Sequence, residues 1–160
     1  MDPQASTASF IAPHLRSGVQ GSIPFRAATV EFGNQGEVVR ATAELELTAI
    51  DTGNPRRDRD LAKPHLLNTH HFPILAVSMD SCSTTATGWT AQVTIAARGR
   101  TCPASLIATR ICAATDSTLR TRIQGSFDRS LLGLHIPGII IGRQIRVELF
   151  AEFRAAPNRP

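Results

Sequence analysis

Short runs of alternating apolar and polar residues are the feature that most constrains how this chain can fold. Between Ala43 and Ala49, apolar side chains occupy every second position, and threonine or glutamate lies between them. Successive side chains of a β-strand point to opposite faces, so this run predicts a strand with one buried face and one wet face. Residues 143–154 repeat the pattern with aliphatic and mostly charged positions.

Turn signals separate the apolar runs, as expected for an all-β chain with ten prolines and eleven glycines. No regular alternation of strands and helices is present, which favours an antiparallel sandwich or an up-and-down barrel over an α/β fold. Residues 51–63 are highly charged and predict a short helical insertion after the third strand. About eight strands are expected: residues 10–15, 28–32, 38–50, 72–79, 88–97, 104–113, 119–127 and 143–154.

Small side chains recur on the faces expected to point inward. An eight-stranded barrel is either just filled by its own side chains or just able to hold one small ligand. The many small residues favour a cavity, and the alternative is that helical turns or a second sheet fill the space. The small inward positions are Ala43, Ala49, Ala76, Ala91, Ala97, Thr109 and Gly125.

The composition argues against several classes of function. The formal charge is +4, but the arginines are scattered and the longest basic run is Arg56-Arg57, so nucleic-acid binding is not expected. Cys82, Cys102 and Cys112 are odd in number and lack CxxC spacing, which argues against a zinc site and a disulfide framework. We therefore expect no metal and no cofactor.

Membrane and export signals are also missing from the sequence as given. No apolar stretch approaches the roughly 18 residues of a membrane span, so stable membrane insertion is not expected. The first residues contain neither a basic segment nor an apolar one. A soluble cytoplasmic protein is therefore expected, although a leader could have been removed. The oligomeric state is open, with a homodimer as one alternative.

Asp51-Thr52-Gly53 matches the catalytic loop of aspartic proteases, and residues 139–143 are similar to a second signature of the dimeric type. That chemistry needs two carboxylates that share a proton in a shielded site. Here a densely charged segment follows the motif directly, and no glycine-rich flap lies between the two signatures. A protease is therefore the least favoured interpretation.

Several blocks in order carry a more specific resemblance. Ile50-Asp51-Thr52-Gly53-Asn54 with Arg57-Asp58-x-x-Leu61 resembles an I-D-T-G-N-x-x-R-D-x-x-L segment, and His71-Phe72-Pro73-Ile74 resembles K-[FY]-P-x-I. On these and further blocks the chain resembles the YceI-like family, lipocalin-like barrels associated with polyisoprenoid binding. The further blocks are residues 10–15 with 19–22, 93–95 with 98–104, 127–134 and 141–149.

The resemblance implies a lipocalin-like, eight-stranded antiparallel barrel over residues 8–154, with tails at 1–7 and 155–160. Three positions depart from the family pattern: Leu66-Leu67 replaces paired phenylalanines, Leu132 replaces an aromatic residue, and Arg143-Gln144 replaces an acidic one. These positions could touch a ligand, so the family resemblance is a better guide to the fold than to the identity of the ligand.

Such a barrel implies a non-enzymatic protein that binds a long apolar small molecule, such as an isoprenoid or a quinone. Each methylene removed from water contributes about 0.8 kcal/mol, so chain length alone can give affinity. Asp51, Arg57 and Asp58 are expected to brace the segment after the third strand. The expected ligand contacts are Phe10, Leu45, Leu47, Phe72, Ile74, Val93, Ile95, Ile107, Ile123, Phe127, Leu134, Val147 and Leu149.

An enzyme is the second hypothesis. The same cavity could act as a mould that folds and cyclises a hydrophobic, polyketide-like metabolite, since a preorganised conformer accelerates a reaction. His14, Trp89 and His135 are the candidate polar participants, although a satisfied structural histidine is the plainer interpretation. His65, His70 and His71 cluster without the spacing of a helical zinc motif, so metal binding there is not expected.

Overall fold

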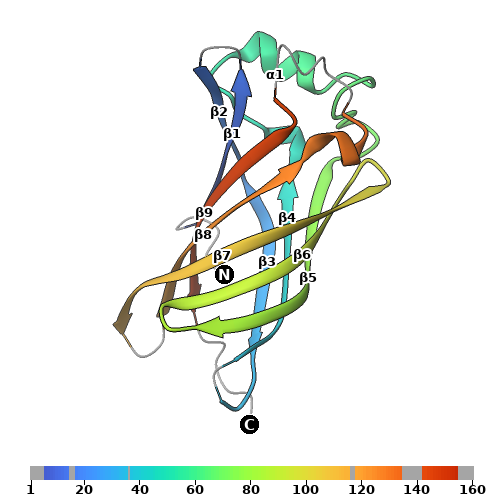
Figure 1. The fold of residues 1–160 in the computed structure, drawn as a ribbon. Helices are drawn as coiled ribbons and strands as arrows, with labels where there is room; N and C mark the ends of the chain where they lie inside the picture. Colours follow the sequence, from blue (N-terminus) through green and yellow to red (C-terminus); the bar gives the residue numbers. More distant parts are fainter. Residues whose placement is uncertain (1–5, 15–16, 36, 116–117, 135–141, 155–160) are drawn as a thin grey trace.

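The computed structural model describes residues 6–14, 17–35, 37–115, 118–134 and 142–154. Within them, nine strands form one curled antiparallel sheet, accompanied by a short α-helix and two 3-10 turns (Figure 1). The strands are β1 (Thr7–His14), β2 (Ser17–Ile23), β3 (Phe25–Phe32), β4 (Val38–Glu46), β5 (Ile74–Thr85), β6 (Gly88–Ala97), β7 (Arg100–Thr115), β8 (Thr118–Asp128) and β9 (Gln144–Arg154). The other elements are η1 (Leu47–Ala49), α1 (Pro55–Leu61) and η2 (Arg129–Leu132).

The strand order is β2-β1-β9-β8-β7-β6-β5-β4-β3, and every neighbouring pair is antiparallel. Pairing of β1 with β9 joins the first strand to the last. The edge strands β2 and β3 are consecutive in the chain and are separated only by Pro24. Two backbone hydrogen bonds between Ser22 and Asp51, of 2.8 and 3.0 Å, connect β2 to the loop before α1. The sheet therefore curls around a single interior.

The predicted all-β, antiparallel fold with one short helix is confirmed, but two details were wrong. The sheet has nine strands rather than eight, and α1 follows the fourth strand rather than the third. The missed strand is β2, in which Gly18 and Gly21 have the sequence character of turn residues. Gly21 pairs with Phe10, and a Cβ at Gly21 would lie 2.4 Å from Phe10 Cζ. That glycine makes room for a neighbouring ring and does not mark a turn.

A closely packed group of side chains lies where β6, β7 and η2 meet. Cys102 is fully buried there beside Ile95, Ala104 and Leu132. Partly buried side chains of β5, β7 and β8 pack against this group. Several of its side chains, including Ile95 and Leu132, also line the cavity that is described below. None of the helices in the described residues is long and apolar enough to cross a membrane.

The segment before α1 is held by a local hydrogen-bond network. Asp58 accepts hydrogen bonds from both the backbone N–H and the hydroxyl of Thr52, at 3.1 and 2.5 Å. Arg57 donates to the Thr52 hydroxyl and carbonyl oxygens, each at 2.8 Å. Asn54 caps the helix by accepting from the N–H groups of Arg56 and Arg57, and Pro55 occupies its first turn. This network confirms the expected bracing role of Arg57 and Asp58.

Replacing Asp58 by alanine should lower the free energy of unfolding by about 1–3 kcal/mol, because two donors on buried Thr52 lose their acceptor. Urea unfolding followed by circular dichroism measures the change. Asp60→Ala is the matched control on the same helix: its carboxylate pairs with Lys63 while both side chains are about half exposed, so the effect should be much smaller. Equal effects of the two substitutions would contradict the bracing role.

Candidate ligand-binding site

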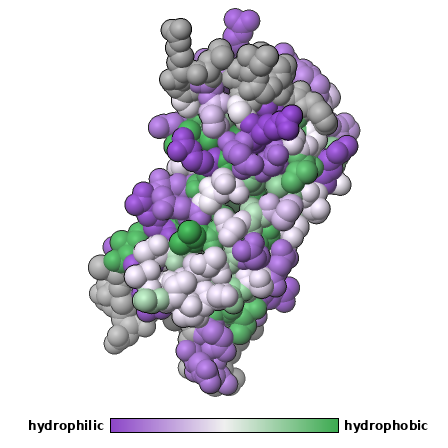
Figure 2. Space-filling view, viewed as in Figure 1, coloured by the Kyte–Doolittle hydropathy of each residue, from purple (hydrophilic) through white to green (hydrophobic). Residues whose placement is uncertain are grey.

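A partly open cavity of ≈ 310 Å³ lies inside the curled sheet, and its lining includes residues from all nine strands. This volume lies at the lower end of the range of small-molecule pockets in proteins, roughly 300–1,000 Å³. The lining is predominantly aliphatic and aromatic, with a few threonines and two arginines. Figure 2 shows the contrast on the outside, where hydrophilic groups cover much of the visible face and apolar groups form separate patches.

Strand alternation directs the apolar side chains inward. On β6 every second residue from Trp89 to Ala97 lines the cavity, and none of the residues between them does. On β9 the same rule holds from Ile145 to Phe153. The wet and dry faces predicted for these two strands are therefore the outer and inner faces of the curled sheet.

Ten of the thirteen predicted ligand-contact residues line this cavity. Their contact with a ligand stays a prediction, because the cavity defines only their position. The ten are Phe10, Leu45, Leu47, Val93, Ile95, Ile123, Phe127, Leu134, Val147 and Leu149.

The other three, Phe72, Ile74 and Ile107, are not among the lining residues. Ile107 is 58% exposed on the outer face of β7, while its neighbours Leu106 and Ala108 point inward. Likewise, Leu75 and not Ile74 lines the cavity on β5. In both places several apolar residues are consecutive in the sequence. The residue predicted to face inward is therefore the neighbour of one that does.

One end of the cavity is covered by α1 and the turns beside it (Figure 1). Leu61 of α1 and Leu67 after it contribute to the lining. Two arginines line the cavity as well, and both donate to backbone carbonyl oxygens. Arg98 Nη1 donates to Gly133 O at 2.7 Å. Polar backbone groups at this end therefore have partners within the protein.

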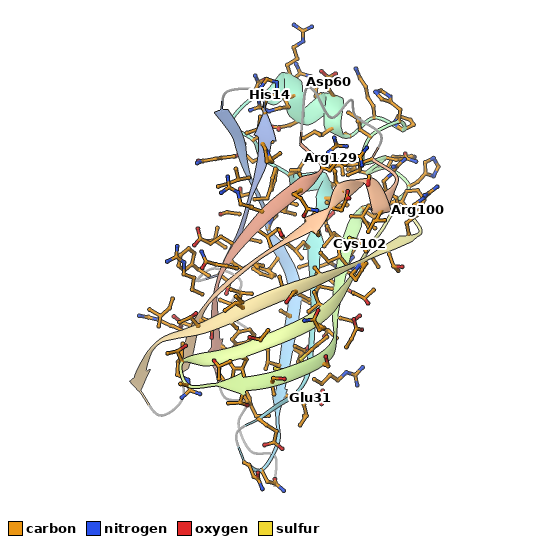
Figure 3. The ribbon with its side chains drawn as sticks, viewed as in Figure 1. His14, Glu31, Asp60, Arg100, Cys102 and Arg129 are labelled. Atoms are coloured by element: carbon orange, nitrogen blue, oxygen red, sulfur yellow. The ribbon has the colours of Figure 1, made fainter. Side chains whose placement is uncertain are left out.

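Arg129 is the more deeply buried of the two arginines, with 3% of its surface exposed. Its Nε donates to Gly142 O at 3.0 Å and its Nη1 to Leu134 O at 2.5 Å, which ties η2 to the segment before β9. Burial lowers the pKa of the Arg129 guanidinium, and the adjacent Asp128 carboxylate opposes that shift. Figure 3 shows Arg129 on the α1 side of the barrel.

The far end of the cavity, near the turn between β5 and β6, contains a different polar group. Trp89 is 4% exposed, lines the cavity, and its indole Nε1 has no hydrogen-bond partner among the described residues. Its ring lies 6.0 Å from that of Phe32, and the guanidinium of Arg110 lies 5.0 Å from the ring centroid. The sequence analysis named Trp89 as a candidate polar participant of an enzyme, which stays a prediction, and it did not identify Arg110.

The histidines lie elsewhere. His14, a candidate polar participant of the enzyme hypothesis, ends β1 on the α1 side (Figure 3) and is not among the residues that line the cavity. His135 lies outside the described residues. His65, His70 and His71 are exposed, and the described part of the chain contains no group of three or more potential metal ligands.

The residues of the Asp51-Thr52-Gly53 motif form local hydrogen bonds that hold the segment before α1. The Asp51 carboxylate is exposed and accepts a hydrogen bond from Gly53 N–H at 2.7 Å, while Thr52 is bound by Arg57 and Asp58. This differs from the shielded, proton-sharing carboxylate pair that aspartic-protease chemistry requires.

Known proteins share both sequence features and the fold of this chain. A family model described as the YceI-like domain matches residues 1–153. Burkholderia cenocepacia BcnA has a similar structure, with 13% identity, a TM-score of 0.83, and coverage of 94% of this chain and 98% of that one. The Campylobacter jejuni YCEI protein is also similar, with 17% identity and a TM-score of 0.78. The match covers 91% of this chain and 90% of that one. No curated protein sequence matches the chain.

A Saccharophagus degradans structure, described as a polyisoprenoid binding domain implicated in plant cell wall breakdown, is also similar. It shares 15% identity with this chain at a TM-score of 0.66, over 97% of each chain. At identities this low, the structural likeness establishes a shared fold and no more.

Cys82 offers a chemical probe of the cavity wall. It lines the cavity from β5, and burial raises the pKa of its thiol. Because the thiolate is the reactive form, N-ethylmaleimide should modify Cys82 more slowly at pH 7.5 than it modifies an unfolded peptide containing this cysteine. The rate should rise about tenfold per pH unit until the raised pKa is reached. Peptide mapping by mass spectrometry separates Cys82 from fully buried Cys102, which should react more slowly still. A rate equal to that of the peptide would contradict this placement.

Proposed function

This chain belongs to the YceI-like family, and we propose that it binds one long apolar molecule, such as an isoprenoid or quinone chain, inside the cavity. The observation that carries the proposal is the lining. Every strand contributes apolar side chains to one continuous space, and small residues such as Ala43 and Ala91 keep that space from being filled. An apolar lining of this kind favours hydrocarbon over water, because water needs polar partners.

The energetics fit a linear chain. Each methylene transferred from water contributes about 0.8 kcal/mol, so about ten buried carbons supply several kcal/mol without any ion pair. The lining presents branched aliphatic residues and aromatic rings of Phe25, Phe127 and Phe153 along the interior. Affinity would then depend mainly on ligand length and cross-section. The description of the Saccharophagus domain as polyisoprenoid binding supports a branched hydrocarbon as the ligand class.

A matched pair of alanines on β6 tests the proposal. Ala91 lines the cavity and Ala96 points to the outer face. In delipidated protein, Ala91→Phe should weaken binding of geranylgeraniol at least tenfold, because the phenyl ring occupies ligand space. Ala96→Phe should bind like the unsubstituted protein. Displacement of the fluorescent hydrocarbon diphenylhexatriene measures affinity, and circular dichroism confirms that both variants fold.

The unsubstituted protein must itself bind diphenylhexatriene and release it to geranylgeraniol at micromolar concentrations. No binding by the delipidated, folded protein would overturn the proposal. Equal binding by Ala91→Phe and Ala96→Phe would place the ligand outside this cavity and would overturn it as well.

A further inference from the structure

The lining of the cavity is exposed to solvent on one strand, β3. Among the described residues that line it, only Thr29 and Phe32 are exposed, and both belong to β3. The Thr29 hydroxyl is hydrogen-bonded to that of Thr42 on β4, at 3.3 Å. Phe32 is 44% exposed, and it is the one large exposed hydrophobic residue of the described chain that also lines the cavity. Phe32 therefore borders both the cavity and the solvent.

Phe32 lies at the end of the barrel opposite α1. It is the last residue of β3, and the turn that follows β3 is at the far end from α1 (Figure 1). The α1 end is closed, because Leu47 and Leu132 line the cavity there and are only 1% and 2% exposed. Leu61 and Leu67 complete the lining at that end. In the described part of the chain, the Phe32 end is thus the less covered of the two.

A contact between two aromatic rings spans the less covered end. The ring centroids of Phe32 and Trp89 are 6.0 Å apart, although β4 and β5 lie between their strands in the sheet order. Favourable ring pairs have centroid distances of roughly 4.5–7 Å, and one such contact favours the arrangement that contains it about two- to tenfold. A contact of this strength can hold an entrance shut and still open readily.

The sheet restrains these two rings differently. Trp89 lies on a central strand that is paired with β5 and β7, and the Arg110 guanidinium lies 5.0 Å from the Trp89 ring centroid. Phe32 lies on β3, which is an edge strand paired with β4, and the register of that pair shifts between Glu31 and Phe32. Moving the end of an edge strand breaks fewer backbone hydrogen bonds than moving a central strand. Phe32 is therefore the ring of the pair that can turn away.

We propose that the apolar ligand enters and leaves the cavity at the end opposite α1, and that Phe32 is the gate residue of this entrance. In the closed arrangement, Phe32 lies against Trp89 as the structure shows. Rotation of Phe32 away from Trp89, together with the end of β3, opens the cavity to solvent. The inference rests on the proposed function and adds to it a route for the ligand and a residue that controls the rate of exchange.

A gate residue and a simple ligand contact affect different rate constants. Loss of a contact speeds dissociation and leaves association nearly unchanged, because affinity differences at one site are mostly differences in the dissociation rate. Loss of a gate speeds association and dissociation together, since both steps wait for the open arrangement. The association rate constant is therefore the readout that separates the two roles of Phe32.

Stopped-flow fluorescence tests the inference on the delipidated full chain. Binding of the neutral apolar probe N-phenyl-1-naphthylamine gives the association rate constant, and its displacement by excess geranylgeraniol gives the dissociation rate constant. Phe32→Ala should raise both rate constants about fivefold, because the ring contact that favours the closed arrangement is lost. Phe32→Leu keeps an apolar side chain without the ring contact, and it should raise both in the same direction. Circular dichroism confirms that the variants fold.

Phe150→Ala is the matched control, because Phe150 is 42% exposed on β9 and is not among the lining residues. It should leave both rate constants unchanged. Leu67→Ala tests the competing route, since Leu67 lines the cavity at the covered end. Its effect on the association rate constant should be smaller than that of Phe32→Ala.

The outcomes separate this inference from the proposed function. If the Phe32 variants speed dissociation alone, Phe32 is a ligand contact and the gate is overturned. Unchanged rate constants in both variants overturn it as well, and binding by the unsubstituted protein then leaves the proposed function standing. Faster association in Leu67→Ala than in Phe32→Ala places the entrance beside α1 and overturns the inference. If the folded, unsubstituted protein binds neither the probe nor geranylgeraniol, the proposed function fails and the entrance fails with it.

Discussion

The backbone hydrogen-bond ladder is the interaction on which the cavity depends. An empty apolar space inside a protein is unfavourable, because its lining loses dispersion contacts and the surroundings tend to collapse. Here collapse would require neighbouring strands to separate or to change register. The uninterrupted pairing of β6 with β7, from Gly88–Thr109 to Ala97–Arg100, holds the wall in place. Side chains that do not span the interior are consequently kept apart, and the space between them persists.

The two ends of the barrel differ in whether their buried polar groups have hydrogen-bond partners. At the α1 end, the arginine donors and the carbonyl oxygens after η2 satisfy one another: Arg98 bonds Gly133, and Arg129 bonds Leu134 and Gly142. At the other end, Trp89 Nε1 and Thr121 Oγ1 are buried and have no hydrogen-bond partner among the described residues.

Sequence periodicity predicted the parts of the fold in which apolar and polar residues strictly alternate. The inward residues of β6 and β9 follow directly from such alternation, and the short helix that contains Asp58 was predicted from its charged residues. Prediction was wrong where alternation is ambiguous: Leu106-Ile107-Ala108 is apolar throughout, so only the pairing with β6 and β8 decides that Ile107 faces outward. The strand β2 was missed for another reason. Gly21 is required by the ring of Phe10 on the paired strand, a contact between segments that local turn statistics do not register.

The hydrogen-bond partners of buried side chains show a further limit of sequence reasoning. Alternation places Trp89 on the inner face, but whether its N–H has an acceptor depends on atoms from strands distant in the chain. Thr121 gave no signal at all, because it lies between Arg120 and Arg122 and reads as part of an exposed polar run. Those two arginines instead pair with Glu152 and Glu148 on β9, along the outer face of the sheet. With Arg120 and Arg122 on the outer face, Thr121 between them is a lining residue of the cavity. The charge pattern in the sequence suggests only a solvated surface, and the pairing of β8 with β7 and β9 shows which face each residue takes.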